Sequence, residues 1–225
     1  MKAMLLAAGR GVRMRPLTDT TPKSLLAVGG KPLIVWHLEK LARAGVSEVV
    51  INHAHLGDMI EAALGDGARF GVSIRYSRER EALETAGGVA QALPWLGADA
   101  FLVINADIYS DCDYSVLARV DLHDRLAHLV LVDNPPQHPR GDFALESGQV
   151  RDSGACLLTF SWMGVYATRL FAAIPPGAKV ALAPLLRKAM AAGRVSGEHY
   201  RGRWHDIGTV ERLQALDAEL RGKPE

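Results

Sequence analysis

Residues 4–18 read MLLAAGRGVRMRPLT, and this stretch decides which class of fold the chain adopts. Its first residues, Met4 to Ala8, form an apolar run with the length of a buried strand. Gly9 and Gly11 follow at the point where such a strand ends and the chain turns. In open α/β sheets, ligands bind beyond the carboxyl ends of the strands. The stretch therefore predicts a ligand-binding loop after a buried strand.

The loop is rich in groups that hold anions. Glycine has no Cβ, so Gly9 and Gly11 allow backbone N–H groups to approach a phosphate closely. The neighbouring cations are Arg10, Arg13, Arg15 and Lys23. Arginine offers a planar fork to phosphate oxygens and lysine a compact point charge, a combination that suits a polyphosphate. A basic, solvated surface turn is the alternative interpretation.

The spacing of the loop differs from two other phosphate-binding motifs. The P-loop requires Gly-Lys-Ser/Thr after four intervening residues, and the dinucleotide fingerprint requires a third glycine that opens a helix. The sequence has Arg13-Met14-Arg15-Pro16 instead, and Pro16 disfavours a helix that continues through this point.

Composition limits the class of partner. The 225 residues include 26 basic and 25 acidic ones, a net charge of +1, so no broad cationic face for nucleic acid is expected. No apolar run approaches the roughly 20 residues that cross a bilayer, and no secretory signal stands at the start. Cys112 and Cys156 are too few for a disulfide framework. These features predict a single domain, residues 1–225, in the cytoplasm, with neither nucleic acid nor membrane as partner.

Helical and strand patterns alternate along the first half of the chain. We expect helices at 32–44, 56–64 and 86–93 and strands at 49–51, 72–76 and 101–105. Further on we expect short strands at 128–132, 143–145, 157–160 and 163–166 and helices at 168–173, 182–192 and 210–220. This order predicts an α/β fold: a Rossmann-like mixed, mainly parallel sheet flanked by helices, with a small antiparallel β excursion. Gly9, His53 and Asp107, each just past a strand, are expected to share one cleft.

Two aspartates have the surroundings of metal ligands. Asp107 directly follows the apolar strand in Ile104-Asn105-Ala106-Asp107, and Asp206 stands in Trp204-His205-Asp206-Ile207-Gly208-Thr209. Magnesium takes oxygen ligands, often one or two carboxylates together with phosphate oxygens and water. Asp206 also has a simpler explanation as an acid at a helix start, where the helix dipole favours negative charge.

At these residues the chain resembles the sugar-1-phosphate nucleotidylyltransferases, whose signature reads Gly-x-Gly-x-Arg with Pro-Leu-Thr and a following Pro-Lys. The resemblance covers residues 1 to 220 and implies a nucleotide-binding half of about 1–110 and a sugar-binding half of about 111–225. It implies that Arg13 binds the departing pyrophosphate and that Lys23 contacts the α-phosphate under attack. The implied nucleotide-binding residues are Leu6, Ala8, Gly9, Gly11, Val12, Arg13, Lys23, Thr85 and Gly87.

The same resemblance implies that Asp107, in an Asn-x-Asp segment, and Asp206, in a Trp-x-Asp-x-Gly-Thr segment, bind Mg²⁺. Asp107, Asp111 and Asp113 also suggest the Asp-x-Asp motif of glycosyltransferases. That alternative leaves Lys23 without a role, and Asp111 and Asp113 have a simpler explanation as turn or helix-cap residues.

The turn Leu83-Glu84-Thr85-Ala86-Gly87-Gly88 is expected to contact the base, with the two glycines letting a flat ring lie against the backbone. A helix start capped by Thr85 is the alternative. The implied sugar-binding residues are Asn105, Gly141, Asp142, Ser161 and Gly164.

Within the family, the wording Glu-Thr-Ala-Gly-Gly is most similar to the short bacterial N-acetylmuramate-1-phosphate uridylyltransferases of cell-wall recycling. The implied partners are a nucleoside triphosphate and a sugar 1-phosphate, for a monomer or small homo-oligomer. The chain departs from many relatives in two places: residues 150–154 replace a Glu-Lys-Pro segment that holds the sugar phosphate, and Trp162 replaces a small residue. Glucose with dTTP or UTP, mannose with GTP, or a non-catalytic sugar-nucleotide sensor therefore remain alternatives.

Overall fold

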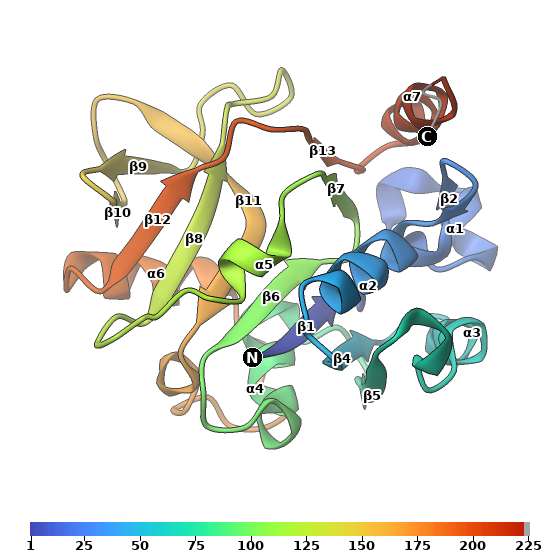
Figure 1. Cartoon of the computed structure of the whole chain (residues 1–225), viewed down its shortest axis with the longest axis horizontal. Helices are drawn as coiled ribbons and strands as arrows, with labels where there is room; N and C mark the ends of the chain where they lie inside the picture. The colour runs from blue at the N-terminus through green and yellow to red at the C-terminus, as the bar shows by residue number, and fades with distance from the viewer. Residues whose placement is uncertain (223–225) are drawn as a thin grey trace.

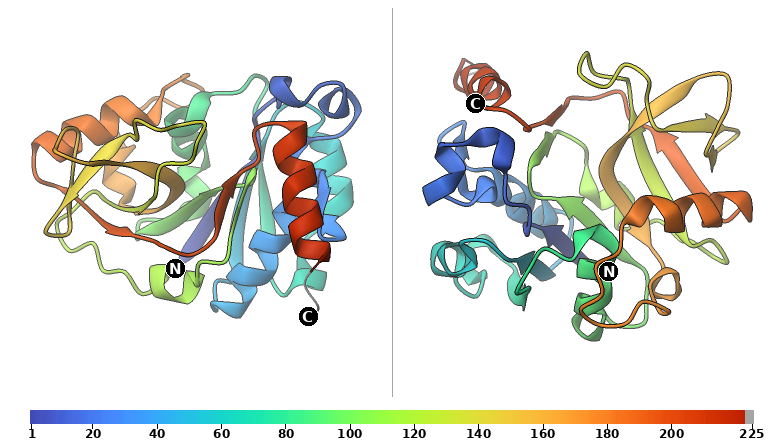
Figure 2. Two further views of the ribbon diagram at one scale, coloured as in Figure 1. Left: turned by 90° about the horizontal axis from the view of Figure 1, so that it is seen from above. Right: turned by 180° about the vertical axis from the view of Figure 1, so that it is seen from behind.

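The computed structural model describes residues 1–222. One sheet of nine strands, in the order β5-β4-β1-β6-β11-β8-β12-β10-β9, forms the centre, with helices on both faces (Figures 1 and 2). The strands of this sheet are β1 (Lys2–Leu6), β4 (Glu48–His53), β5 (Ser73–Arg78), β6 (Phe101–Asn105), β8 (Ala127–Val132), β9 (Phe143–Glu146), β10 (Gln149–Arg151), β11 (Leu157–Tyr166) and β12 (Val195–His199). The predicted mixed α/β class is confirmed.

The two faces of the sheet carry different helices because side chains alternate along each strand. The longer helices are α2 (Leu33–Arg43), α3 (Gly57–Leu64), α4 (Glu84–Leu96), α6 (Leu182–Ala191) and α7 (Val210–Arg221). Ala3 and Leu5 of β1 pack with α2 and α3, whereas Met4 packs with α4 and α6. Short helical turns are η1 (Val12–Met14), α1 (Leu17–Thr20), η2 (Lys23–Leu25), η3 (Ala68–Phe70), α5 (Tyr114–Leu117) and η4 (Thr168–Leu170).

Two small two-stranded sheets complete the fold. They are β2 (Ala27–Val28) with β3 (Lys31–Pro32), and β7 (Ile108–Ser110) with β13 (Trp204–Asp206). Behind β13, helix α7 packs Leu213 and Leu216 against Met14, Leu26 and other residues of the N-terminal segment. Figure 1 shows α7 beside α1 and β2, so this helix packs on the segment that follows the glycine-rich loop.

Strands β5, β4, β1 and β6 run parallel, and all four lie within residues 1–110, the half predicted to bind the nucleotide. Strand β11 then runs antiparallel between β6 and β8. The far half curls, because β9 pairs with both β10 and the start of β11. The register brings the carboxyl ends of three strands level: Leu6 of β1 pairs with Asn52 of β4 and with Asn105 of β6.

Several expected elements differ from the structure. The two strands expected at 157–160 and 163–166 are one strand, β11, whose register shifts between Phe160 and Gly164. Trp162 has a φ of 63° there, so the polar Ser161-Trp162 step forms a bulge that bends the strand without ending it. The helix expected at 168–173 is only the turn η4, because Pro175 and Pro176 follow closely and disfavour helical backbone before them. Within residues 1–222, no helix has the length and apolar character of a membrane-spanning segment.

Candidate active site

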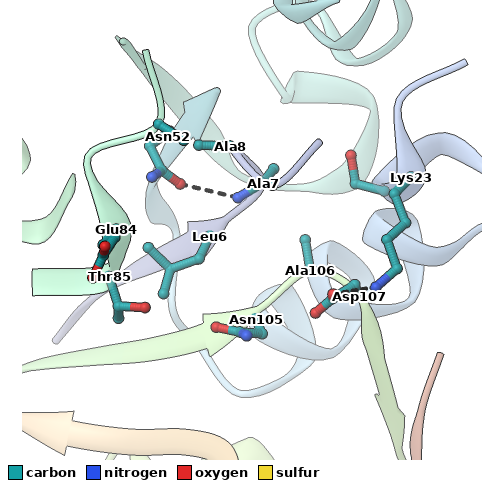
Figure 3. A pocket seen from close by; sticks show the side chains of 13 residues that line it. Leu6, Ala7, Ala8, Lys23, Asn52, Glu84, Thr85, Asn105, Ala106 and Asp107 are labelled. Carbon is teal, nitrogen blue, oxygen red and sulfur yellow. Dashed lines mark hydrogen bonds and ion pairs between the residues drawn. The ribbon is translucent and has the colours of Figure 1, made fainter. Parts of the chain in front are cut away.

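The level ends of β1, β4 and β6 border a cavity of about 180 Å³ (Figure 3). The residues that line it are Leu6, Ala7, Ala8, Gly9, Lys23, Ser24, Asn52, Ala82, Glu84, Thr85, Asn105, Ala106 and Asp107. Figure 3 shows Lys23 and Asp107 on one side and Glu84 and Thr85 on the other. The cavity therefore lies where the end of a parallel sheet is expected to receive a ligand.

The structure brings together part of the predicted site. Among the predicted residues, those that line the cavity are Leu6, Ala8, Gly9, Lys23, Thr85, Asn105 and Asp107. Those outside its lining are Gly11, Val12, Arg13, Gly87, Gly141, Asp142, Ser161, Gly164 and Asp206. Ser24 and Asn52 also line the cavity and were not among the predicted site residues, whereas Glu84 belongs to the turn that was expected to contact the base. Ser24 directly follows Lys23, and its buried hydroxyl makes no hydrogen bond within the part of the chain that the structure describes. The ligand-binding roles of all these residues stay predictions.

Lys23 is the cation of the cavity. It begins the turn η2 and is 9% exposed, and its Nζ forms an ion pair with Asp107 Oδ2. Asp107 lies between β6 and β7, next to Ala106, whose N–H donates to the carbonyl of Leu6. A part-buried amine and carboxylate thus neutralise each other beyond the carboxyl ends of β1 and β6. An anionic ligand in the cavity would offer Lys23 a second partner.

The glycine-rich loop closes on itself. Gly11 has a φ of 65°, and a Cβ there would lie 2.9 Å from Thr18 Cγ2, so only glycine fits. The Thr18 hydroxyl donates to the Gly11 carbonyl at 2.8 Å. Gly9 differs: a Cβ there would meet nothing within 4 Å among the described residues, so space for a ligand remains above its backbone.

Arg13 lies next to the second acidic motif. A Cβ on Gly208 would be 3.3 Å from an Arg13 guanidinium nitrogen and 2.5 Å from one of Arg212. Arg13 is exposed and forms no ion pair within residues 1–222, whereas Arg212 is paired with Asp206. The helix α7 therefore carries a second guanidinium to the loop, which the sequence reasoning missed.

Asp107 and Asp206 come from adjacent backbones. Asp206 belongs to β13 and pairs in register with Ile108 of β7, and the Ile207 N–H donates to the Asp107 carbonyl at 3.1 Å. The expectation that Asp206 stands at a helix start is wrong, because Thr209 caps α7 and its side chain accepts from Arg212 N. Carboxylates on two adjacent segments, Asp107 just before β7 and Asp206 in β13, suit the oxygen preference of Mg²⁺. No cluster of three or more His, Cys, Asp or Glu side chains occurs in residues 1–222, so phosphate and water would supply further ligands.

His53 does not share the cavity, which corrects the expectation that it joins Gly9 and Asp107. Its Nε2 is 2.7 Å from Glu61 Oε1, on α3. Side chains alternate along β4, so the preceding residue, Asn52, faces the cavity instead. The sequence located the strand end but not its register.

The turn before α4 is packed differently from the expectation. Helix α4 begins at Glu84, and its N-cap is Leu83 without a side-chain bond, so Thr85 is not the cap. A Cβ on Gly87 would lie 2.2 Å from the Ala178 carbonyl oxygen, and one on Gly88 would lie 2.7 Å from Asn52 Nδ2. Both glycines are buried against protein atoms, whereas Glu84 and Thr85 of the same turn line the cavity. The contact of this turn with a base stays a prediction.

The predicted sugar-binding residues of the second half are bonded into the sheet. Asp142 Oδ2 accepts from Phe160 N at 2.8 Å, and Ser161 Oγ donates to the Val130 carbonyl at 2.6 Å. A Cβ on Gly141 would lie 2.8 Å from Asn134 Oδ1, and one on Gly164 would lie 2.9 Å from the His128 carbonyl. These contacts give each residue a structural role in the curled half of the sheet.

The competing Asp-x-Asp motif is accounted for by local structure. Asp113 caps α5, since its Oδ1 accepts from Ser115 N at 2.8 Å. Asp111 accepts from the Tyr200 hydroxyl and pairs with Arg203 at 3.1 Å. The helix-cap interpretation of Asp113 is confirmed, and Asp111 ties β7 to the strand-β13 segment.

Comparisons with known proteins agree with this geometry. A family model described as nucleotidyl transferase matches residues 2–144. The chain is 53% identical to an N-acetylmuramate alpha-1-phosphate uridylyltransferase of Neisseria meningitidis serogroup B, over 97% of each chain. It is 34% identical to the protein of that name from Caulobacter vibrioides, over 97% of this chain and 96% of the relative. A solved structure assigned as a glucose-1-phosphate thymidylyltransferase from Bacillus anthracis has a TM-score of 0.87 at 23% identity, over 100% of this chain and 97% of that one, and shows the same fold.

Proposed function

Because this chain belongs to the nucleotidyl transferase family, we propose that it transfers a uridylyl group from UTP to N-acetylmuramate 1-phosphate. A phosphate oxygen of the sugar 1-phosphate attacks the α-phosphorus of UTP. The bond from that phosphorus to the β-phosphate oxygen breaks, so pyrophosphate leaves and a UDP-sugar forms. Two relatives matched over nearly their full length carry this specificity in their names, which supports the choice of sugar and base.

The observation that carries the proposal is the position of Lys23. Lys23 is 9% exposed and lines the cavity at the ends of β1 and β6, where its ammonium pairs with Asp107. A positioned cation stabilises the charge that develops on a phosphorus centre under attack. Lys23 would exchange Asp107 for the α-phosphate when UTP binds, and Arg13, beside Gly208, would face the departing pyrophosphate.

No general base is required for this reaction. The second pKa of a phosphate monoester is about 6, so the attacking phosphate is largely a dianion at neutral pH. The chain's task is to hold two anions together in line and to neutralise their charge. The open backbone at Gly9 and the cations Lys23, Arg13 and Arg212 suit that task.

Asp107 and Asp206 would hold Mg²⁺ together with phosphate oxygens. Their backbones are joined by the hydrogen bond from Ile207 N–H to the Asp107 carbonyl, and each carboxylate is paired with a cation, Lys23 or Arg212. When bound, Mg²⁺ supplies neutralisation of the phosphate charge and an ordered set of oxygen contacts. Dependence of turnover on Mg²⁺ is part of this proposal. So are a cytoplasmic location and a monomer or small homo-oligomer as the state of assembly.

The test is a matrix of nucleoside triphosphates against sugar 1-phosphates with pyrophosphate release as the readout. We expect the highest kcat/KM for UTP with N-acetylmuramate 1-phosphate, and loss of release with EDTA. A preference for glucose 1-phosphate with dTTP, or for mannose 1-phosphate with GTP, would refute the specificity and keep the family. Binding of UTP with no release for any sugar would favour a sugar-nucleotide sensor.

A further inference from the structure

A buried chain of hydrogen bonds runs beneath the cavity. Ala7 N donates to Asn52 Oδ1 at 2.9 Å, a contact visible in Figure 3. Asn52 Nδ2 donates to Glu79 Oε1 at 2.7 Å, and Leu83 N donates to Glu79 Oε2 at 2.9 Å. Asn52 is 2% exposed and Glu79 is 6% exposed. The two side chains therefore form a continuous bridge between two backbone N–H groups.

The two ends of the bridge belong to opposite sides of the cavity. Ala7 is the first residue after β1 and begins the glycine-rich loop. Leu83 directly precedes Glu84 and Thr85, which line the cavity on its other side. The bridge thus spans from the loop expected to hold the phosphates to the turn expected to hold the base.

Donor and acceptor counting explains why one member must be an acid. Both ends of the bridge are N–H donors, so the side chains at 52 and 79 must each present an acceptor outward. Between them, one must donate and the other must accept. An amide at 52 and a carboxylate at 79 meet these conditions, whereas two amides leave one donor facing another in any orientation. A buried donor without an acceptor is costly.

The acid is maintained at a site that disfavours its charge. Burial raises the pKa of Glu79, and no ion pair involves Glu79 within residues 1–222. A buried carboxylate without a cation depends on the hydrogen bonds it accepts. Those come from Asn52 and from Leu83.

Gly88 of α4 packs against the bridge so closely that no side chain fits there. A Cβ there would lie 2.7 Å from Asn52 Nδ2 and 2.8 Å from Glu79 Oε1, closer than real Cβ contacts. The helix that carries the turn therefore packs its bare backbone directly on the bridge. Strand β4, the end of β5 and helix α4 meet at this point.

We propose that Asn52 and Glu79 are positioning residues. They hold the glycine-rich loop and the turn before α4 at a fixed separation, which matches the distance between the phosphates and the base of one bound nucleotide. This inference rests on the proposed nucleotidyl transfer. It assigns to Glu79, which lies outside the cavity lining, a role in the KM for the nucleoside triphosphate. The sugar phosphate is expected to bind against the other half of the sheet, so its KM should respond less.

The test exchanges the amide at position 52 and the carboxylate at position 79. Glu79→Gln leaves two amides and a donor–donor contact, and we expect the KM for UTP to rise about tenfold while the KM for the sugar phosphate changes less than about twofold. Asn52→Asp provides the second single variant. The double variant Asn52→Asp/Glu79→Gln restores an acceptor at each end and a donor between them, with the same net charge. We expect it to return the KM for UTP to within about threefold of the starting protein. Glu48→Gln, on the exposed side of β4, is the matched control.

Hydrogen exchange at the Ala7 and Leu83 amides gives a readout that needs no activity. We expect faster exchange at both amides in Glu79→Gln and recovery in the double variant. A nearly unchanged KM for UTP in Glu79→Gln, or a double variant at least as impaired as Glu79→Gln, would overturn the proposal. If the unmodified chain releases no pyrophosphate, the proposed function fails, whereas the exchange data and the affinity for UTP still decide whether the bridge acts.

Discussion

At the carboxyl ends of β1 and β6, the side chains of Lys23, Asn105 and Asp107 face a cavity. In the second half, the side chains of Asp142, just before β9, and Ser161, on β11, are bonded into the sheet. In the first half, a ligand has only to replace the Lys23–Asp107 ion pair. In the second half, the polar groups are already satisfied by Phe160 N and the Val130 carbonyl. The comparison indicates that substitutions in the first half should affect turnover, and those in the second half stability.

The largest expected effect is that of Lys23→Ala. Removal of a cation that stabilises transition-state charge lowers turnover by roughly 100- to 1000-fold. The fold should survive, because the Lys23 partner Asp107 is 32% exposed and water can solvate it. Pyrophosphate release and circular dichroism are the measurements, with Lys188→Ala on the exposed face of α6 as the control. Turnover within tenfold of the unmodified chain would contradict the assignment.

Beneath β7, His37 links stability in the first half to pH. Its Nε2 donates to the Ile108 carbonyl at 2.8 Å, and its Nδ1 is 2.7 Å from the Tyr114 hydroxyl. Burial lowers the pKa of His37 from 6.5 to about 4. As the pH falls from 6.5 to about 4, the unfolded chain binds the proton first, and the free energy of unfolding decreases.

We expect that decrease to be at most about 3 kcal/mol. His37→Gln keeps a donor and an acceptor but does not titrate, so urea denaturation of this variant should show a smaller loss of stability over the same pH window. The slopes of the two curves are compared at equal salt. An identical slope in both would mean that other groups cause the loss.

In the second half, Asp142→Ala removes the acceptor of Phe160 N. That donor is buried, so we expect the free energy of unfolding to fall by about 1–2 kcal/mol while the KM for UTP stays unchanged. Denaturation and steady-state kinetics measure the two quantities. The KM for the sugar phosphate tests the predicted contact with sugar in the same samples. An unchanged free energy of unfolding in Asp142→Ala would contradict the view that polar groups of the second half serve mainly stability.

The smallest effect is expected for Trp162→Gly. Its φ of 63° is a conformation that glycine adopts without strain, which favours the variant by about 1 kcal/mol. Its ring is 40% exposed and contacts Phe160 at 5.2 Å between centroids, so the lost packing offsets that gain. We expect a net change below about 1 kcal/mol by denaturation. A loss above about 2 kcal/mol would show that the indole holds the bulge in place.

Much of the fold and the core of the site were predictable because their signals are local in the chain. The strand at 101–105 agrees with β6 residue for residue, and the apolar run at the start placed Gly9 at the strand end next to the cavity. Spacing along Gly9, Gly11 and Lys23 is a property of one short segment. Parallel topology then brings Asp107 to the same edge, since the carboxyl ends of such strands point the same way.

Other parts of the site depend on contacts between remote segments, which no local pattern reports. The choice of Asn52 over His53 follows from strand register, and a one-residue shift reverses which side chain faces the cavity. Asp206 lies in a strand because β13 pairs with β7, not because of its own neighbours. The bulge at Trp162 follows from the pairing of β11 with β8.

By itself, therefore, the sequence determined the parallel half of the sheet, the position of the glycine-rich loop after β1 and the two acidic motifs, because each is encoded within a few consecutive residues. Only the tertiary structure decided that Gly88 packs on Asn52 and Glu79, and that Gly87 packs on the Ala178 carbonyl. Those contacts join segments separated by tens of residues. Their physical cause is close packing and hydrogen-bond satisfaction in the buried interior, which is settled by three-dimensional neighbours and not by position in the chain.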